Sequence, residues 1–407
     1  KTSLNQKLSI VNDSYHSNIL TKINYFSTDS TIFEKYNFQL NAPILDENFK
    51  LLYNNNQLLI NNILDIRKIS FTNSITKKEI DSKHIYINYV DSVKYYNFEE
   101  SIQSLLDNSI KYSISNDTIY VQSNSYLITK KMIFPLNYNV NIAKGTQFNI
   151  SDGISILIQG SLIAHGDNAN PVKIQSSNEK PYGTFAIRPP SKNSVVSMKH
   201  CYIKGGYQDV LQGVDYTGQI SIHGGSKVIL DNVKIENSSS DDGINIKNSE
   251  VEIKNSYFLN NFGDQIDLDY CSGIVINNTF LYDVNNPKLI NSNRDGLDIS
   301  GSFVKISNNL FSNFSDKGIS VGEKSKAYIF ENIFKTNNNG IVLKDASIVY
   351  SLDNEFHNNN YNYSSYIKKP FYSDPVLYTT YDLDTINNRI VDGKVIVTDR
   401  RKFNFEF

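Results

Sequence analysis

The sequence predicts an all-β protein whose central part is a right-handed parallel β-helix, a solenoid with about 22 residues in each coil. Two recurring columns of residues carry this prediction. The first is a dipeptide that ends in an aliphatic residue: Gly243-Ile244, Gln265-Ile266, Gly296-Leu297, Gly318-Ile319 and Gly340-Ile341. Its spacings are 22, 31, 22 and 22 residues. We therefore expect the five aliphatic side chains to form one interior column.

The second column is mainly aromatic and keeps almost the same spacing, 23, 22, 31, 23 and 22 residues. Its members are Ile235, Phe258, Phe280, Phe311, Phe334 and Phe356. An asparagine column accompanies it, and we expect hydrogen bonds between its stacked side chains: Asn232, Asn255, Asn278, Asn309, Asn332 and Asn354. Both columns place one nine-residue insertion in the same coil, near Tyr282–Arg294. A leucine-rich repeat has a similar period, but its Leu-x-x-Leu-x-Leu pattern is missing.

Residues 1–117 show no repeat and are predicted to form an N-terminal capping region. Within it, Ile85–Val90 alternates like a strand, and Asn97–Ile110 is predicted to form a helix that is capped by Asn97. Its apolar face is expected to contain Phe98, Ile102, Leu105 and Leu106. Because a solenoid has open ends with unpaired strand edges, we interpret this helix as the plug of the first coil.

The coils are expected to occupy residues 118–365, where short apolar strands alternate with Gly, Asn, Asp and Ser. Residues 366–407 are predicted to be the C-terminal cap, with a late strand at Val395–Thr398. The basic aromatic segment Tyr361–Tyr372 has two interpretations: it closes the solenoid, or its exposed tyrosines stack on sugar rings.

Composition and charge exclude several classes of protein. A formal net charge of −2 gives no general attraction to nucleic acid. No apolar run reaches the roughly 18 residues needed to span a bilayer. The polar stretch that begins at Lys1 is not expected to be a signal peptide, but we expect a secreted or cell-surface protein, and the sequence does not predict its oligomeric state. Cys201 and Cys271 stand alone, either as two small buried side chains or as a disulfide.

The aligned repeat also produces two polar columns on one side of the predicted coils. One column contains Asp242, Asp264, Asp295, Lys317 and Asn339, and the other contains Asn245, Asp267, Asp298, Ser320 and Val342. Two carboxylates one strand spacing apart, ~4.8 Å, repel by roughly 3 kcal/mol at an effective dielectric constant of ~20. A bound cation, Lys317 with Arg294, or raised carboxylate pKa values must offset this repulsion. Alternatively, these residues are only repeated turn chemistry.

Three segments of the repeat resemble motifs of polygalacturonases, which are β-helix hydrolases. Ser240-Asp-Asp-Gly-Ile-Asn245 is similar to their Asn-Thr-Asp-Gly-Ile-Asp motif, Gly263-Asp264-Gln265 to Gly-Asp-Asp, and Asp316-Lys-Gly-Ile-Ser-Val-Gly322 to Gly-His-Gly-Ile-Ser-Ile-Gly. The resemblance implies catalytic roles for Asp242 and Asp264, although Lys317 stands where the family has histidine. The aligned polar column adds Asp295 as a further catalytic candidate.

The repeat region more widely resembles bacterial right-handed β-helix proteins of the pectin-lyase-like superfamily, through Asp316–Ser325 and Gly340–Ser347. Lyases with this fold neutralise a uronate carboxylate with a cation and use a Lys or Arg base. On that reading, calcium, which prefers oxygen ligands, is held by Asp264, Asp267, Asp295 and Asp298. Lys317 acts as the catalytic base if burial lowers its pKa. Substrate contacts are expected from Arg294, Asn245, Glu323 and Tyr270.

Two functional hypotheses follow. The first is an extracellular lyase or hydrolase that acts on an acidic polysaccharide through the aspartate-rich patch. The second is a glycan-binding or structural surface solenoid without catalysis. The acidic residues gather on three adjacent predicted coils, which favours the first; the scattered histidines and the incomplete family motifs favour the second.

Overall fold

The computed structural model describes residues 96–398 except 190–192, 226, 284–293, 382 and 384–386, and of residues 1–95 it describes only the backbone of eight strands. The predicted strand Ile85–Val90 and most of the predicted insertion lie outside this description. The chain divides into two compact units, Lys1–Val93 and Lys94–Phe407. The predicted plug helix therefore belongs to the second unit, together with the coils.

The first unit consists of antiparallel strands. One sheet has the order β3 (Thr31–Leu40), β2 (Asn18–Ser27), β7 (Ile63–Asn73), β8 (Glu79–Ile80). Two further pairs join β1 (Asn5–Ile10) to β6 (Asn56–Asn61) and β4 (Ile44–Leu45) to β5 (Leu51–Leu52). Antiparallel pairing distinguishes this unit from the coils.

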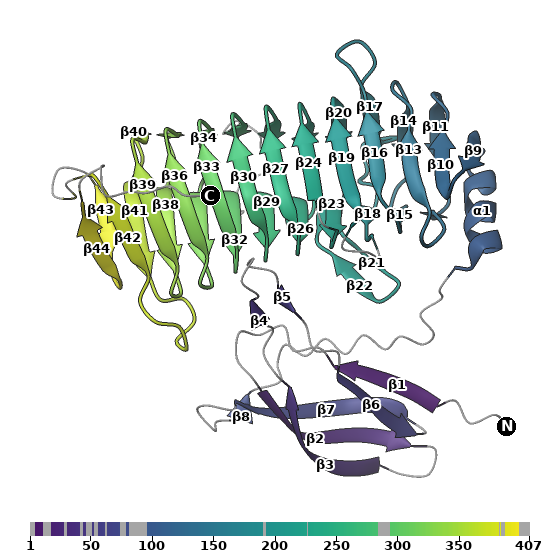
Figure 1. Ribbon diagram of the computed structural model, residues 1–407, viewed down its shortest axis with the longest axis horizontal. Coiled ribbons are helices and arrows are strands. Elements are labelled where there is room, and N and C mark those ends of the chain that lie inside the picture. Colours follow the sequence, from purple (N-terminus) through teal and green to yellow (C-terminus); the bar gives the residue numbers. More distant parts are fainter. Residues whose placement is uncertain are drawn as a thin grey trace. The chain divides into compact units, whose positions relative to one another are not determined.

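The second unit is the predicted β-helix, because successive coils add one strand each to three sheets (Figure 1). The strands of these sheets pair in parallel, except β9, which pairs antiparallel with β10 at the first coil. The 13-stranded sheet contains β9 (Tyr112–Ser115), β10 (Thr118–Val121), β13 (Asn139–Ile142), β16 (Leu162–His165), β19 (Val195–Lys199), β24 (Lys227–Asp231), β27 (Glu250–Lys254), β30 (Ser272–Ile276), β33 (Phe303–Ser307), β36 (Lys326–Phe330), β39 (Ile348–Leu352), β42 (Val376–Thr379) and β44 (Lys394–Val397). The 10-stranded sheet contains β11 (Ser125–Ile128), β14 (Gln147–Ile150), β17 (Val172–Ser176), β20 (Cys201–Lys204), β25 (Lys234–Glu236), β28 (Tyr257–Leu259), β31 (Thr279–Leu281), β34 (Leu310–Ser312), β37 (Ile333–Lys335) and β40 (Glu355–His357).

The third sheet has 11 strands and carries the acidic residues. It contains β12 (Met132–Ile133), β15 (Ile156–Ile158), β18 (Phe185–Ile187), β23 (Gly218–His223), β26 (Asp242–Lys247), β29 (Asp264–Asp269), β32 (Asp295–Ser300), β35 (Lys317–Gly322), β38 (Asn339–Lys344), β41 (Tyr361–Tyr366) and β43 (Asn388–Ile390). A hairpin of β21 (Asp209–Leu211) and β22 (Val214–Tyr216) precedes β23.

The interior columns match the predicted register. The five aliphatic residues from Ile244 to Ile341 pair in sequence across neighbouring strands and are fully buried. The rings of Phe258, Phe280, Phe311, Phe334 and Phe356 stack with centroid distances of 4.9, 4.6, 5.2 and 5.2 Å. The predicted fold class and interior are therefore confirmed.

The asparagine column is confirmed in part. Asn278, Asn309, Asn332 and Asn354 form a buried ladder, in which each amide donates to the side-chain oxygen of the next coil at 3.0, 2.9 and 3.0 Å. The alignment of the first two members was wrong by one residue. Val233 and Ser256 occupy the equivalent positions, whereas Asn232 and Asn255 are turn residues with positive φ.

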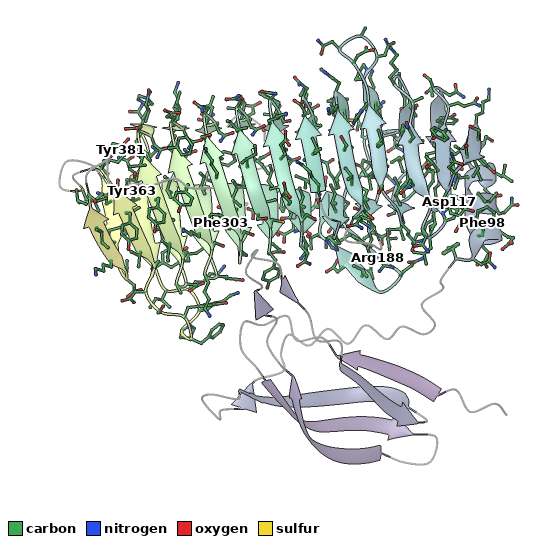
Figure 2. The ribbon with its side chains drawn as sticks, in the orientation of Figure 1. Phe98, Asp117, Arg188, Phe303, Tyr363 and Tyr381 are labelled. Atoms are coloured by element: carbon green, nitrogen blue, oxygen red, sulfur yellow. The ribbon has the colours of Figure 1, made fainter. Side chains whose placement is uncertain are left out.

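Both ends of the second unit are covered (Figure 2). The helix α1 (Phe98–Asp107) has the predicted Asn97 cap, because the side chain of Asn97 accepts from the backbone N–H of Glu100 at 2.8 Å. Leu105 is buried, but Leu106 is 52% exposed, so the predicted apolar face is narrower than expected. At the other end, the Tyr381 ring lies 5.9 Å from the ring of Phe356, the last member of the phenylalanine column.

The remaining sequence predictions concern the cysteines and the late strand. Cys201 and Cys271 are both free and buried, so the disulfide alternative is wrong. The late strand is present as β44, which pairs in parallel with β42. In the part of the chain that the structure describes, no helix has both the length and the apolar character needed to cross a bilayer.

Candidate functional site

The acidic residues lie on three neighbouring strands of the 11-stranded sheet, β26, β29 and β32. We call Asp242, Asp264, Asp267, Asp295 and Asp298 the acidic ladder. Asp242 pairs with Asp264, Asp267 pairs with Asp298, and Asp295 pairs with Lys317 of the following strand, as the repeat predicted.

Glycine explains why residues three positions apart share one side of the sheet. Simple alternation would place Asp295 and Asp298 on opposite faces of β32. Between them, a Cβ on Gly296 would lie only 2.6 Å from the carbonyl oxygen of Gly318 and 2.7 Å from the Phe311 ring. The backbone therefore passes close to the interior at the glycine and the alternation is interrupted, so the two carboxylates come together.

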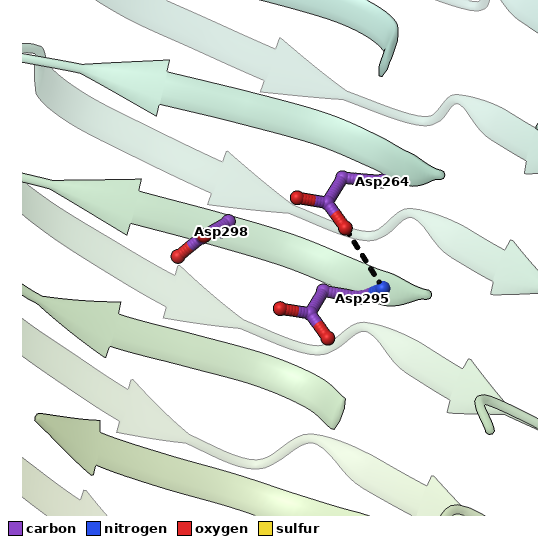
Figure 3. Close-up of side chains that lie close together, drawn as sticks. All are labelled: Asp264, Asp295 and Asp298. Atoms are coloured by element: carbon purple, nitrogen blue, oxygen red, sulfur yellow. Dashed lines mark hydrogen bonds between the residues drawn. The ribbon is translucent and has the colours of Figure 1, made fainter. Parts of the chain in front are cut away.

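Three carboxylates of the ladder form a tight cluster (Figure 3). One carboxylate oxygen from each of Asp264, Asp295 and Asp298 lies within 4.8 Å of the others. The backbone N–H of Asp295 donates to Oδ1 of Asp264 at 3.0 Å, which fixes the side chain of Asp264 across the strand boundary. The predicted metal ligand Asp267 lies three residues after Asp264 on β29, outside this cluster of three.

One part of the acidic ladder has neutral hydrogen-bond partners. Asp242 accepts from the Thr217 hydroxyl at 2.6 Å, and Asp267 accepts from the Asn245 amide at 2.8 Å. Among the described residues, no lysine or arginine forms an ion pair with Asp242, Asp264 or Asp267. Burial, with the charges of Asp241 and Asp269, raises the pKa of Asp242 to about 7. Burial and neighbouring carboxylates raise the pKa values of Asp264 and Asp267 well above the ordinary range.

The other part is paired with lysines. Lys317 Nζ lies 3.1 Å from both carboxylate oxygens of Asp295 and also contacts Asp316. Lys344 Nζ lies 4.0 Å from Oδ1 of Asp298. Burial raises the pKa of Asp295 to about 7 although the charge of Lys317 opposes this shift. The acidic ladder therefore contains carboxyl groups with raised pKa values, and it places those without an ion pair beside Asp295 and Asp298, which have a lysine partner.

Comparison with protein families identifies this stack of strands. Residues 242–369, less than half of the chain, match the family described as "Right handed beta helix region". These residues are a right-handed β-helix region. The match begins at the first residue of the acidic ladder, so the ladder belongs to the part of the chain that carries the family pattern.

Solved structures share the β-helix architecture at low sequence identity. The enzymatically active domain of bacteriophage CBA120 tailspike protein 2 is 10% identical, with a TM-score of 0.45 over 70% of this chain and 48% of that one. The A-module of Azotobacter vinelandii mannuronan C-5 epimerase AlgE4 is 10% identical, with a TM-score of 0.33 over 74% and 93%. The Streptococcus pneumoniae surface adhesin PfbA is 11% identical, with a TM-score of 0.30 over 74% and 87%.

The chain spans about half the length of the tailspike structures, 48% of the active domain and 43% of the full-length protein. No curated protein matches the sequence.

The environment of Lys317 does not suit a catalytic base, which needs a lowered pKa. Burial lowers the pKa of Lys317, but the charges of Asp295 and Asp316 outweigh burial and hold the pKa above its ordinary value. The condition that we set for a lysine base, a lowered pKa, is therefore not met. The resemblance could not reveal this, because the ion pairs depend on side-chain positions.

The predicted substrate-binding residues are dispersed. Asn245 is fully buried and bridges the ring of His223 to Asp267, both at 2.8 Å. The guanidinium of Arg294 lies 4.0 Å above the Tyr282 ring. Tyr270 and Glu323 follow the last residues of β29 and β35, roughly 20 Å along the strand from the level of Asp264. Of these four residues, Asn245 is the one placed in the acidic ladder by a described hydrogen bond, through Asp267.

Sequence reasoning missed Thr217, His223, Lys247 and Lys344. Lys247 pairs with Asp269 at 2.8 Å, and Lys344 faces Asp298. The signal for both lysines was present, because the repeat alignment places them in a third outward column with Asp269. Thr217 and His223 belong to a coil that is preceded by the β21–β22 hairpin, where the period of the repeat is lost.

Proposed function

We propose that this chain cleaves glycosidic bonds of an acidic polysaccharide outside the cell, by carboxylate acid–base chemistry on the acidic ladder. One observation carries the proposal. Asp264, whose pKa is raised well above the ordinary range, lies in a cluster with Asp298, which has the Lys344 ammonium beside it. Two neighbouring carboxyl groups with different electrostatic environments are what glycoside hydrolysis requires.

The chemistry follows from these environments. Protonated Asp264 would donate its proton to the glycosidic oxygen, so that the leaving sugar departs as a neutral alcohol. Asp298 would act as the second carboxylate, either attacking the anomeric carbon or activating water. The pKa values of about 7 for Asp242 and Asp295 also suit proton transfer near neutral pH.

A polymeric substrate is supported by the form of the site. The ladder repeats on successive coils and runs along the solenoid axis, which suits a linear chain of repeating sugars. The lysines that flank the acidic ladder, Lys247, Lys317 and Lys344, offer partners for uronate carboxylates. The extracellular location rests on the resemblance of the coils to those of bacterial surface β-helices.

The test uses Asp264→Asn and Asp298→Asn, with Asp231→Asn on β24 as the control. Asp231 and its ion-pair partner Lys254 both lie on the 13-stranded sheet, away from the acidic ladder, so the substitution should leave the acidic ladder intact. Purified protein is incubated with polygalacturonate and alginate, and new reducing ends are measured together with the ultraviolet absorbance of unsaturated products. We expect the parent and the Asp231→Asn control to produce reducing ends without unsaturated products. Asp264→Asn and Asp298→Asn should produce neither. Unsaturated products would indicate a lyase, and inactivity of the parent on every acidic polysaccharide would overturn the proposal.

A second candidate function is calcium-dependent glycan binding without catalysis. The observation in its favour is the cluster itself, because oxygen atoms that share one calcium ion lie up to about 5 Å apart. The clustered oxygens of Asp264, Asp295 and Asp298 meet this limit, and Oδ1 of Asp298 lacks a hydrogen bond. The fit is incomplete, since Lys317 already contacts both oxygens of Asp295.

The double variant Asp264→Asn with Asp295→Asn distinguishes the two functions. If the ladder is a calcium-dependent binding site, this variant loses calcium affinity and glycan affinity together in titration calorimetry. If the parent binds glycan equally well with and without a chelator, the calcium function is excluded. If the double variant binds glycan and melts like the parent, the ladder serves only the turns, and both functions fail.

A further inference from the structure

A hollow in the surface lies at the corner of the coils that precedes the acidic ladder. It has a volume of about 600 Å³ and is found where β17, β20, β25 and β28 end and the chain turns toward the 11-stranded sheet. The side chains that we use below are Asn178, Glu179, Lys204, Asn237, Ser239 and Phe262. We call this hollow the corner cleft. Its volume falls within the usual range for ligand sites.

The corner cleft is continuous with the acidic ladder along the chain. Two of its lining residues, Ser239 and Phe262, are followed within three positions by Asp242 and Asp264. The connection is rigid, because a Cβ on Gly263 would lie 2.0 Å from the carbonyl oxygen of Asp241, so the two corners are in close contact. The corner cleft therefore lies beside the beginnings of β26 and β29, where Asp242 and Asp264 stand.

The lining has the composition of a sugar site. Phe262 is 45% exposed and offers an apolar surface. Around it stand the amide groups of Asn178 and Asn237 and the hydroxyl of Ser239, which can bond to sugar hydroxyls.

The cation of the cleft lining is Lys204. Its ammonium lies 3.4 Å from Glu236, a carboxylate that it shares with Lys234 at 2.7 Å, so Glu236 does not neutralise Lys204 alone. Glu179 lines the cleft as an opposing negative charge.

We propose that the corner cleft is a second glycan subsite, which holds sugar residues of the same acidic polysaccharide whose next residues lie over Asp242 and Asp264. Phe262 stacks on one sugar ring, and Lys204 binds a uronate carboxylate. This proposal rests on the proposed function, because it assigns the bound polymer to the same substrate.

The test compares Phe262→Ala with Phe371→Ala, a matched control whose ring is 54% exposed and does not line the cleft. The probes are oligogalacturonate and oligomannuronate, each as disaccharide and hexasaccharide, and affinity is measured by titration calorimetry. Only the hexasaccharide is long enough to occupy the ladder and the corner cleft together. We expect Phe262→Ala to weaken hexasaccharide binding by about tenfold to a hundredfold. Disaccharide binding should stay unchanged, and Phe371→Ala should resemble the parent.

Two charge variants refine the assignment. Lys204→Gln should weaken hexasaccharide binding, and Glu179→Gln should strengthen it, if a uronate occupies the cleft. If the parent cleaves acidic polysaccharide and Asp264→Asn does not, while Phe262→Ala leaves hexasaccharide affinity unchanged, the corner cleft is not a subsite and the proposed function stands. If the parent binds none of the probes, the proposed function fails and the subsite fails with it. An unchanged melting temperature of Phe262→Ala confirms that the comparison reports on binding.

Discussion

At the scale of single residues, hydrogen-bond partners separate carboxyl groups that look alike in the sequence. Asp267 and Asp298 stand at equivalent positions of adjacent coils. Asp267 accepts a hydrogen bond from Asn245, whereas Asp298 faces the ammonium of Lys344. Asn245 in turn depends on His223, because its amide nitrogen is used for Asp267 and its oxygen faces the histidine ring. A neutral His223 that donates from Nε2 fits this arrangement, and burial lowers the pKa of His223 to about 4.

We predict that His223→Ala destabilises the protein, because the buried carbonyl oxygen of Asn245 loses its donor. The expected loss in the free energy of unfolding is about 1–3 kcal/mol, measured by urea denaturation. His223→Gln keeps a donor and should recover part of the loss. The control is His357→Ala, since His357 is 51% exposed. Equal stability of His223→Ala and the parent would show that Asn245 is oriented by other groups.

At the scale of elements, each strand contributes the same side chains to the same column. Ile319 of β35 lies between Leu297 and Ile341 with no exposure to solvent. Ile333 of β37, in contrast, is 39% exposed. The same substitution can therefore be compared at a buried position and at an exposed position.

Ile319→Asp should be severely destabilising, by more than about 4 kcal/mol, because it buries an unpaired charge between coils. Ile333→Asp is the matched control and should change the stability by less than about 1 kcal/mol. Thermal unfolding of both variants measures the difference. Similar melting temperatures for Ile319→Asp and the parent would contradict the interior register.

The asparagine ladder supports a second prediction at this scale. Asn309 accepts from the backbone N–H of Asn278 at 2.8 Å and donates to the carbonyl oxygen of Val275 at 2.9 Å. Asn309→Ala leaves buried backbone groups without partners and should cost about 3 kcal/mol in unfolding free energy. The exposed Asn387 provides the control, and Asn387→Ala should be close to neutral. If Asn309→Ala unfolds with the same free energy as the parent, the asparagine ladder is excluded as a source of stability.

These elements show what the sequence could predict. The positions of Ile319 and Phe311 followed from the residue spacing of the repeat, because every coil needs apolar side chains at the same interior positions. Counting also placed Asp264 near Asp295, since both belong to one outward column. It could not predict that Lys317 is held by two aspartates or that Asn245 is turned toward His223, because those contacts depend on rotamers and on one irregular coil. Ser256 was missed because a serine oxygen replaces the asparagine oxygen in the ladder.

At the scale of the whole molecule, the acidic ladder makes stability depend on pH. Asp242 and Asp295 have pKa values of about 7 in the folded protein, against an ordinary value of 3.8. The folded state therefore binds more protons than the unfolded state between pH 4 and pH 7, and its stability falls as the pH rises through this window. His223 acts in the opposite direction, because its folded pKa of about 4 lies below the ordinary 6.5.

We predict a higher melting temperature near pH 5 than near pH 8, since four ladder carboxyl groups have raised pKa values and two histidines with lowered pKa values, His165 and His223, oppose them. Asp242→Asn should flatten this dependence and raise the melting temperature at pH 8. If calcium occupies the cluster of Asp264, Asp295 and Asp298, its addition at pH 8 should raise the melting temperature of the parent. A melting temperature that rises steadily from pH 5 to pH 8 without added cations would contradict the raised pKa values.

The uniform interior of the solenoid has a kinetic consequence. A folding chain that omitted one coil could still place phenylalanine on phenylalanine and asparagine on asparagine, so these contacts do not distinguish the correct neighbour from the next one. The charged column does distinguish them, because Asp295 meets Lys317 in the native order but would meet Asn339 if one coil were skipped. The ion pair would then be lost and a buried carboxylate left without its cation. The charged residues of the proposed catalytic site therefore also distinguish one coil from the next. They disfavour a stack in which one coil is skipped, an error that the repeated interior contacts would not prevent.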